Sequence, residues 1–396
     1  MTMPELIPVQ WKLPQGTAVN PITALEAEWT RLELAAQVAS KQIAIGIGSR
    51  GVAEIDTIAR TLVRLVAESG GTPFIVPAMG SHGGATASGQ IEVLDSLGVS
   101  EATMGCPIRA TMETVVLGET ARGIPVHFDK FAAEADGLIV ANRVKIHTDF
   151  HGLHESGVVK MLGIGLGKER GATLLHNFGV VGLRDYMPEV TAVILQKINL
   201  IAGIATVEDG THRPVHLQAM PASELLAEEQ KLLDLARSYA PRLPVADLDL
   251  LIVEEMGKEI SGTGMDTNVI GRWRIAGEPE PESPRIRAIV VLNLTEASHG
   301  NSVGIGLADF TTRRLLDKIN FDHFTTNTFT SGFLERGRLP LVFPSDEAAI
   351  NAALTHLFRP NPQDRPHARI MRIRNTLDLG TVWVSPNLVG EIGGNQ

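Results

Sequence analysis

The residues best suited to chemistry gather between Val140 and Asn177, in the sequence VANRVKIHTDFHGLHESGVVKMLGIGLGKERGATLLHN. This stretch holds four of the twelve histidines of the protein, together with five basic residues and a glycine-rich turn. They are His147, His151, His154 and His176, with Arg143, Lys145, Lys160, Lys168 and Arg170. A segment that only fills space has no need for so many imidazoles, ammonium groups and glycines. We therefore expect the chemistry of the protein to be centred here.

Histidines are suited to proton transfer, because the pKa of imidazole lies close to neutral pH. Two of them can act as opposed acid and base on one carbon or hydroxyl group. His82 is a further candidate, since it lies among glycines in PAMGSHGGATASGQ, at residues 77–90. Arg50, Lys258 and Arg272 can hold a carboxylate, and arginine is best suited to a bidentate contact. These residue types indicate chemistry on a small organic acid.

Metal binding is an alternative use of the same histidines. His147 and His151 have the i, i+4 spacing that places two zinc ligands on one face of a helix. Gly152 and the preceding Thr-Asp pair disfavour a helix there. Cys106 is the single cysteine, so neither a disulfide framework nor a thiolate cage can form within one chain. A metal would have to be held by imidazole, carboxylate or an imported cofactor.

Two glycine-rich turns are candidates for binding a phosphate or a carboxylate. GIGSRG at residues 46–51 matches the GxGxxG pattern of dinucleotide sites, and GIGLGK at 163–168 resembles a phosphate loop. The second turn fails the Walker spacing, since Glu169 follows its lysine. The strand after the first turn ends in Pro-Ala-Met, without the acidic residue that would hold a ribose hydroxyl. What remains is a set of backbone N–H groups, assisted by Arg50 or Lys168.

The elements that must position these residues alternate between strand and helix in the first part of the chain. We predict strands at 42–47, 73–76, 136–141 and 200–206, helices at 52–69, 169–175, 188–197 and 222–239, a helix starting near residue 86, a β-rich excursion at 105–131 and a loop at 208–216. Turns that follow the strands of such a β-α-β unit lie on the ligand side of a parallel sheet. Arg50 and His82 both take that position.

A second α/β pattern follows PRLP at residues 241–244, the best candidate for a domain boundary. We predict strands at 248–254 and 286–294, helices at 308–319 and 348–358, a polar loop at 321–332, and strands or a hairpin between 369 and 384. The fold class is therefore α/β, with two α/β domains that contain parallel-rich sheets. Residues 1–243 form a cofactor-binding domain, and 244–396 form a second domain whose last residues can pack back on the first. We expect the active site in the cleft between the domains.

Composition excludes several classes of protein. The 396 residues exceed one ordinary domain, and the net charge of −10 argues against binding to nucleic acid or an anionic membrane. No apolar segment approaches the ~20 residues of a membrane span. The N-terminus lacks the basic start and apolar run of a signal peptide. We expect a soluble, cytoplasmic protein that captures a small anionic substrate through local positive charge.

Three features together resemble the nickel-dependent lactate racemase family. They are the loop AMGSHGGATASGQ with His82, the histidine-rich segment that leads to SGVVK at residues 156–160, and His176, which follows Lys160 by sixteen residues. The resemblance covers most of the chain. It implies a two-domain α/β layout and a nickel-pincer nucleotide, a pyridinium mononucleotide whose two sulfur arms hold the metal. It also implies cofactor-synthesis enzymes as partners.

The resemblance assigns roles to individual positions. Lys160 would be linked to the cofactor through a thioamide, and His176 would be the only protein ligand to nickel. His82 would be one of two catalytic bases. The substrate would be held by Arg50 and Lys258, and further cofactor contacts are assigned to Ser49 and Lys168.

The chain departs from the family in the segment before the lysine. The family has a histidine ten residues before that lysine, where this chain has Phe150. The second base must therefore be His147, His151 or His154. We prefer His147, because it directly follows the predicted strand. The family also has an acidic residue three positions before the arginine, where this chain has Ile47, so phosphate or ribose contacts can differ.

These observations predict a racemase or epimerase of a 2-hydroxy acid. A base would take the hydroxyl proton while hydride moves from the substrate carbon to the pincer ring, and the planar 2-keto acid would receive hydride on its other face. Two alternatives stay open. One is a nicotinamide-dependent oxidoreductase of a hydroxy acid, which GIGSRG favours weakly, and the other is a non-catalytic protein that binds an anion or a metal. The sequence does not name the hydroxy acid.

Overall fold

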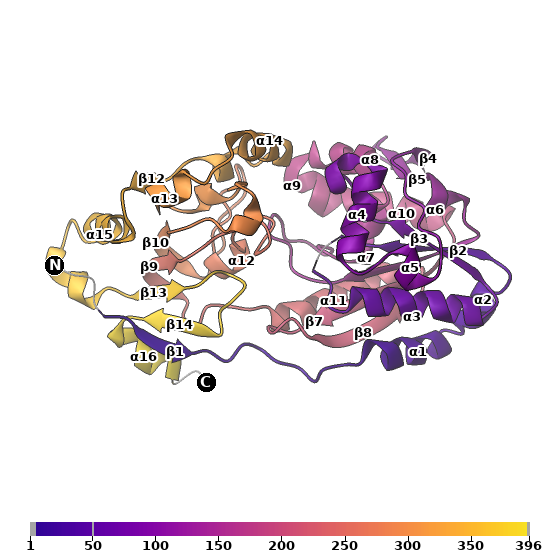
Figure 1. The fold of residues 1–396 in the computed structure, drawn as a ribbon, viewed down its shortest axis with the longest axis horizontal. Helices are drawn as coiled ribbons and strands as arrows, with labels where there is room; N and C mark the ends of the chain where they lie inside the picture. Colours follow the sequence, from indigo (N-terminus) through magenta and orange to yellow (C-terminus); the bar gives the residue numbers. More distant parts are fainter. Residues whose placement is uncertain (1–4, 50, 394–396) are drawn as a thin grey trace. The chain divides into compact units, whose positions relative to one another are not determined.

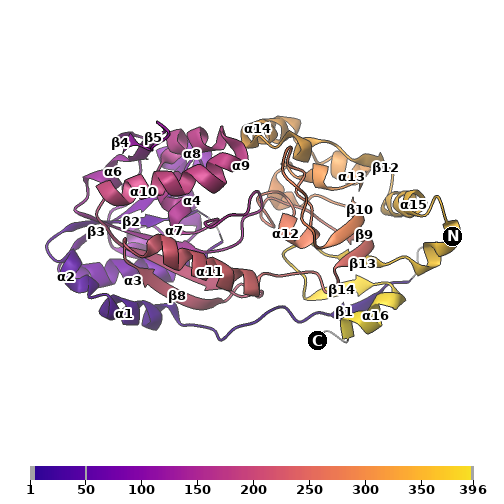
Figure 2. The ribbon, with the colours of Figure 1, turned by 180° about the vertical axis from the view of Figure 1, so that it is seen from behind.

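The computed structural model describes residues 5–49 and 51–393. The chain divides into two compact units (Figures 1 and 2): Pro14–Ala240, here the N-terminal unit, and Met1–Leu13 with Pro241–Gln396, here the C-terminal unit. Both units are α/β with mostly parallel strands, which confirms the predicted fold class. The predicted boundary after residue 243 lies near the observed division at 240. The first residues, which the prediction gave to the first domain, belong to the C-terminal unit, as do the last.

A five-stranded sheet in the order β3-β2-β6-β7-β8 forms the frame of the N-terminal unit. Strands β2, β3, β6 and β7 are parallel, and β8 is antiparallel to β7. Their bounds are β2 Gln42–Ile47, β3 Thr72–Pro77, β6 Gly137–Arg143, β7 Leu200–Glu208 and β8 Pro214–Met220. The parallel strands are buried along most of their length, as expected for a sheet that is covered on both faces.

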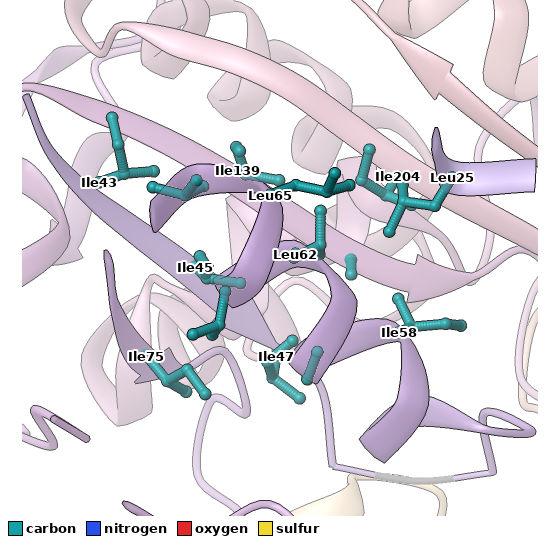
Figure 3. Packing of buried hydrophobic residues seen from close by; sticks show 14 of the residues in the cluster. Leu25, Ile43, Ile45, Ile47, Ile58, Leu62, Leu65, Ile75, Ile139 and Ile204 are labelled. Atoms are coloured by element: carbon teal, nitrogen blue, oxygen red, sulfur yellow. The ribbon is translucent and has the colours of Figure 1, made fainter. Parts of the chain in front are cut away.

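Helices cover the two faces of this sheet. On one face lie α1 (Pro21–Arg31) and α3 (Ile55–Glu68), whose residues Ile58, Leu62 and Leu65 pack with Ile45 and Ile204 of the strands (Figure 3). Alternate residues of a strand point to opposite faces. Gly203, the neighbour of Ile204, accordingly faces α7 (Val158–Lys160) and α11 (Leu225–Tyr239) through Val158 and Leu225.

The remaining helices of the N-terminal unit follow the chain between these strands. They are α2 Leu34–Val38, α4 Ala87–Ser96, α5 Glu101–Met104, α6 Lys130–Glu134, α8 Lys168–His176, α9 Gly179–Val181 and α10 Met187–Lys197. The π-helical turn Met161–Gly165 continues α7 toward α8, and the π-helical turn Gly182–Tyr186 joins α9 to α10. The predicted β-rich excursion is the antiparallel pair β4 (Thr114–Glu119) and β5 (Pro125–Asp129).

The C-terminal unit contains a seven-stranded sheet in the order β1-β14-β13-β9-β10-β11-β12. Strands β9 to β13 are parallel, and β14 and β1 continue the sheet in antiparallel pairs. The strands are β1 Ile7–Gln10, β9 Asp247–Val253, β10 Arg285–Val291, β11 Phe310–Thr312, β12 Leu341–Phe343, β13 Ile370–Ile373 and β14 Thr381–Val384. The helices are α12 Thr267–Ile270, α13 Arg313–Leu316, α14 Phe321–Ser331, α15 Asp346–Leu357 and α16 Pro386–Gly393.

Three predictions of secondary structure were wrong. The helix predicted at 308–319 is the short strand β11 followed by α13, because residues 310–312 pair with β10 and β12. The loop predicted at 321–332 is mostly helix α14. Asn320 caps the N-terminus of this helix, because its side chain accepts hydrogen bonds from the backbone N–H groups of Asp322 and His323. The loop predicted at 208–216 ends early, because β8 begins at Pro214.

Parallel strands carry the segments that follow them to a single edge of the sheet. The segments after β2, β3 and β6 start at residues 48, 78 and 144. In the sheet, β3 lies on one side of β2, and β6 lies on the other side. The chain therefore changes direction across the sheet after β3, and the point between β2 and β6 is a topological switch point. Among the described residues, no helix combines the length and apolarity needed to cross a membrane.

The core predicts a stability difference between two isoleucines. Ile45 is fully buried in β2, whereas Ile22 in α1 is 39% exposed. We expect Ile45→Ala to lower the free energy of unfolding by about 2–5 kcal/mol, because it leaves a cavity in a packed sheet. Ile22→Ala should change it by about 0.5 kcal/mol. Urea unfolding followed by circular dichroism checks both, and equal losses would contradict the packing described for β2.

Candidate functional site

Two loops at the carboxyl edge of the N-terminal sheet are joined by Ser49 and His82. Ser49 follows β2, and His82 lies in the loop that follows β3. The Ser49 Oγ and His82 Nδ1 atoms are 2.5 Å apart. A hydroxyl can donate to or accept from a ring nitrogen, so this contact is compatible with either tautomer of His82. Arg50, the predicted substrate residue next to Ser49, lies outside the described residues.

The His82 loop is shaped by glycine. Gly83 has a φ of +66°, and a β-carbon at this position would lie 2.5 Å from the backbone of Gly89. Only glycine fits such an approach without strain. Thr86 then caps α4 through a hydrogen bond that its side chain accepts from Gly89. The loop therefore turns tightly into α4, and His82 stands exposed at its outer side.

A buried ion pair between Lys168 and Asp129 packs against the loop of His82. Lys168 and Asp129 are both fully buried, and Lys168 Nζ lies 3.0 Å from Asp129 Oδ2. Lys168 also donates to the carbonyl oxygen of Pro77 at 2.6 Å and to Gln90 Oε1 at 3.0 Å. Gln90 in turn donates to the carbonyl oxygens of Gly80 and His82.

These contacts determine what Lys168 can do. Lys168 donates two hydrogen bonds and lies at ion-pair distance from Asp129, so its ammonium group is engaged inside the protein. Burial raises the pKa of Asp129 and lowers the pKa of Lys168, while the mutual attraction of the two charges opposes both shifts. Lys168 therefore takes part in the packing of this loop, and its predicted contact with the cofactor stays a prediction.

His147 lies beside Lys160. Its Nε2 atom is 2.6 Å from Lys160 Nζ, and its Nδ1 atom accepts a hydrogen bond of 3.0 Å from the backbone N–H of Asp149. The ring packs against that of Phe150, with 4.5 Å between the centroids. Burial, followed by the charge of Lys160, lowers the pKa of His147 well below the ordinary value. The imidazole is therefore neutral at pH 7.

Glu155 holds the loop that carries His147. Its buried carboxylate accepts from the backbone N–H of His147 at 2.6 Å and from that of Gly152 at 3.3 Å. His151 Nδ1 lies 3.2 Å from the same carboxylate, and Arg237 of α11 donates to it at 2.8 Å. A buried carboxylate with this set of partners fixes the loop to α11.

The three histidines of this loop therefore have different surroundings. His147 faces Lys160, and His151 faces Glu155. His154 is buried, with Nδ1 at 3.6 Å from Glu229 Oε1. The interaction that supports His147 as the second base is its contact with the predicted cofactor lysine. The residues are not on a helix, so the i, i+4 zinc arrangement of His147 and His151 does not form.

Lys160 and His176 lie on consecutive helical segments, α7 and α8. His176 Nδ1 is 2.6 Å from the carbonyl oxygen of Ala172, one turn earlier in α8. A carbonyl only accepts, so Nδ1 carries the proton and Nε2 holds the lone pair. Desolvation lowers the pKa of His176, and the nearby charge of Lys160 acts in the same direction, although the residue as a whole is exposed. His147, Lys160 and His176 thus belong to one electrostatic neighbourhood.

Lys258 and Arg272 are in the C-terminal unit. Lys258 Nζ donates to the carbonyl oxygen of Gly262 and, at 3.0 Å, to Asn327 Oδ1. Arg272 donates to Asp309 Oδ2 at 2.6 Å and to two backbone carbonyl oxygens. The guanidinium of Arg272 is therefore part of the packing of this unit, and substrate binding by Lys258 stays a prediction.

Sequence analysis missed the buried acids and amides that position the site. Glu229 accepts from the backbone N–H of Val159 at 3.0 Å, and its carboxylate fills the space beside Gly157. A signal for it existed: Glu229 falls on the buried stripe of α11, between Leu225 and Leu232. An acid in an apolar stripe needs a partner. Asp129 and Gln90 gave no comparable signal, because their partner Lys168 is distant in the sequence.

The side chains that could bind a metal ion do not form a complete site by themselves in the part of the chain that the structure describes. Within residues 5–49 and 51–393, no group of three or more histidine, cysteine, aspartate or glutamate side chains is arranged to hold a metal ion. A metal at this site would need ligands that arrive with a cofactor, in addition to an imidazole such as that of His176.

Comparisons with known proteins give a matching family model and a solved structure with a similar fold. A family model described as a domain of unknown function, DUF362, matches residues 54–226. Among solved structures, the chain is similar to the lactate racemase apoprotein from Thermoanaerobacterium thermosaccharolyticum, with a TM-score of 0.55. The sequences are 12% identical, and the likeness covers 94% of this chain and 99% of that chain. No curated protein matches the chain. The chain shares the α/β fold of that lactate racemase.

The buried pair predicts a pH-dependent stability defect. Lys168→Met leaves the Asp129 carboxylate buried without its counter-ion, and we expect a loss of about 3–5 kcal/mol at pH 8. The pKa of Asp129 is already raised by burial, and loss of the lysine raises it further. An acid whose pKa is higher in the folded state than in the unfolded state destabilises the fold at a pH above both pKa values. This destabilisation disappears as the pH falls through the folded-state pKa. The defect should therefore shrink at pH 5.

Urea unfolding at both pH values measures the effect. Lys197→Met, at an exposed position on α10, serves as the control and should change little at either pH. A defect of equal size at pH 5 and pH 8 would contradict the ion pair.

Proposed function

We propose that the protein is a racemase or epimerase of a 2-hydroxy acid. The observation that carries the proposal is the grouping of His147, Lys160 and His176 in one neighbourhood, within a chain that has the fold of a lactate racemase. His82 follows a parallel strand of the same sheet. Two imidazoles of this kind are what inversion at one carbon requires, because acid and base exchange roles between the two directions of the reaction.

The residues fit a nickel-pincer nucleotide. Lys160 offers an amine on a half-buried side chain, and His176 offers the Nε2 lone pair, since its Nδ1 hydrogen bonds to the carbonyl oxygen of Ala172. The hydrogen bond from Nδ1 to Ala172 would orient the imidazole for metal binding and fix its tautomer. When bound, the cofactor supplies an acceptor and donor of hydride. Synthesis and loading of such a group would require dedicated partner enzymes.

His82 suits a base that must also act as an acid. Its Nδ1 atom faces the Ser49 hydroxyl, which accepts when Nδ1 is protonated and donates when it is not. The Nε2 atom can therefore take a proton from a substrate hydroxyl and return it without loss of the Ser49 contact. We assign to Ser49 the positioning of His82, in addition to the predicted contact of Ser49 with the cofactor. His147 is the proposed second base, and its lowered pKa keeps it neutral.

The substrate is a small carboxylate in this proposal. The net charge of the protein is −10, so an anion must be attracted by local cations against the overall field. Lys145 contributes positive potential near His147 and keeps its charge when the cofactor is bound to Lys160. Arg50 and Lys258 are the proposed carboxylate partners, and arginine would give the bidentate contact that orients a 2-hydroxy acid.

A deuterium experiment tests the reaction. The cofactor-loaded protein is incubated in D₂O with single enantiomers of 2-hydroxy acids, including sugar acids, and the products are analysed by chiral chromatography and mass spectrometry. We expect inversion with retention of the original hydrogen on carbon, because hydride does not exchange with solvent. His82→Gln should lower kcat by about 10²–10⁴, and His356→Gln, on α15 of the other unit, should not.

Other outcomes of this experiment are decisive. Deuterium on the carbon would indicate proton abstraction in place of hydride transfer. Formation of the keto acid only with added nicotinamide cofactor would favour the oxidoreductase, and no change in any acid would favour a non-catalytic binding protein.

Metal content tests the assigned ligand separately. His176→Ala should reduce nickel to less than about a tenth of the wild-type content per chain, because loss of one ligand of a metal site typically weakens binding strongly. His151→Ala, whose ring faces Glu155, is the matched control and should keep its nickel. Elemental analysis of purified chains measures both. Nickel kept in the first variant and lost in the second would move the metal site to the histidine-rich loop.

A further inference from the structure

The side-chain amide of Asn142 has a defined orientation. Asn142 is the last residue but one of β6, and 9% of its surface is exposed. One end of the amide faces two backbone carbonyl oxygens, that of Gly157 at 3.2 Å and that of Arg143 at 3.3 Å. A carbonyl oxygen accepts hydrogen bonds and cannot donate one, so this end must be Nδ2. The Oδ1 atom therefore faces the other way.

The Oδ1 atom of Asn142 faces the segment that follows β2. A β-carbon at Gly48 would lie 2.8 Å from this oxygen, so only a glycine leaves it uncovered from that side. Within residues 5–49 and 51–393, no N–H or O–H group donates a hydrogen bond to Oδ1. A polar atom on so buried a side chain is normally hydrogen-bonded. Oδ1 is therefore able to accept a hydrogen bond from a bound molecule.

This acceptor lies among the segments of the candidate site. Gly48 directly precedes Ser49, whose hydroxyl group contacts His82. The carbonyl group of residue 157, which holds Nδ2, directly precedes α7, the helix that ends at Lys160. Gly48 follows β2, and Asn142 is near the end of β6. These two strands flank the topological switch point of the sheet, where sheets of this kind bind their ligands.

The chemistry of an amide oxygen limits what it can bind. An amide oxygen has no hydrogen, so its partner must donate one. Carboxylate and phosphate groups present acceptor oxygens at neutral pH, whereas a hydroxyl group can donate. In the proposed reaction, the hydroxyl group on the inverted carbon gives its hydrogen to an imidazole base. The partner of Asn142 must then be a second hydroxyl group, one that does not react.

We propose that Oδ1 of Asn142 binds a non-reacting hydroxyl group of a polyhydroxylated ligand. Such a group is present in a 2-hydroxy acid of the sugar-acid type, which has a further hydroxyl group, and in the ribose of a mononucleotide. Both sources offer the same donor, and binding measurements distinguish them. The choice of a second hydroxyl group rests on the proposed function, whereas the orientation of Asn142 rests on its hydrogen bonds alone.

Isothermal titration calorimetry of the full chain, purified without cofactor, tests the proposal with two sets of probes. Each enantiomer of glycerate is compared with the matching lactate, which lacks one hydroxyl group. Nicotinate mononucleotide is compared with its 2′-deoxy and 3′-deoxy forms. In one of the two sets, we expect loss of the hydroxyl group to raise Kd by about tenfold, the usual effect of one hydrogen bond. Equal Kd values within both sets, or no binding of any probe, would overturn the proposal.

Two variants identify the residue responsible. Asn142→Ala removes the acceptor. Gly48→Ala places a β-carbon against Oδ1, and the backbone at this position does not have the positive φ that only glycine adopts readily. In both variants, the probes of the responding set should bind equally. Asn199→Ala is the matched control, because Asn199 donates to the carbonyl oxygen of Asp136 at the opposite edge of the sheet, and it should keep the difference in Kd.

Thermal unfolding shows whether each variant folds. Gly48→Ala leaves the Asn142 amide in place, so it decides the question if Asn142→Ala does not fold. A tenfold difference in Kd that persists in Gly48→Ala would refute the role of Oδ1. The measurement needs no turnover: hydroxyl-dependent binding by a chain that inverts no acid would contradict the proposed function alone. Inversion of an acid together with equal Kd values would contradict the role of Asn142 alone.

Discussion

Parallel strands bring their carboxyl ends to one edge of a sheet, and the candidate site depends on this constraint. The segments after β2, β3 and β6 supply Ser49, His82 and His147, which come from distant parts of the sequence. Their strands are held in register by ladders of backbone hydrogen bonds between mostly buried residues. The sheet fixes where each loop begins. It does not fix where an imidazole points, which requires a second set of interactions.

Buried charges provide that second set. Lys168 and Asp129 fix the loop of His82 through Gln90 and Pro77, and Glu155 fixes the loop of His147. Charges inside a protein cost free energy unless they are paired and hydrogen-bonded, so each of these groups has several partners. The result is directional: a carboxylate or ammonium with three or four fixed contacts allows few alternative loop conformations. The polar interior of this unit therefore supports orientation more than stability.

The sequence predicted the parts of this arrangement that rest on local patterns. Short β-branched runs located β2, β3 and β6, and the glycines around His82 indicated a loop with an exposed backbone. The helix α14 was missed because its apolar residues do not form a clear stripe, and Phe321 and Phe329 are exposed. The ion pair of Lys168 could not be predicted, because nothing in its own segment reveals Asp129, which comes from β5. Partners distant in sequence decide whether a charge faces inward, and a local pattern cannot contain them.

Helix α11 has a consequence for the order in which this unit can be completed. It is the last element of the N-terminal unit, and its residues Glu229 and Arg237 bind the start of α7 and the carboxylate of Glu155. Glu229 and Val159 are separated by 70 positions in the chain. During synthesis the sheet strands emerge first, and the loop of His147 and the first turn before Lys160 must wait for α11. A nascent chain that stops before residue 225 thus holds the frame of the unit without a finished site.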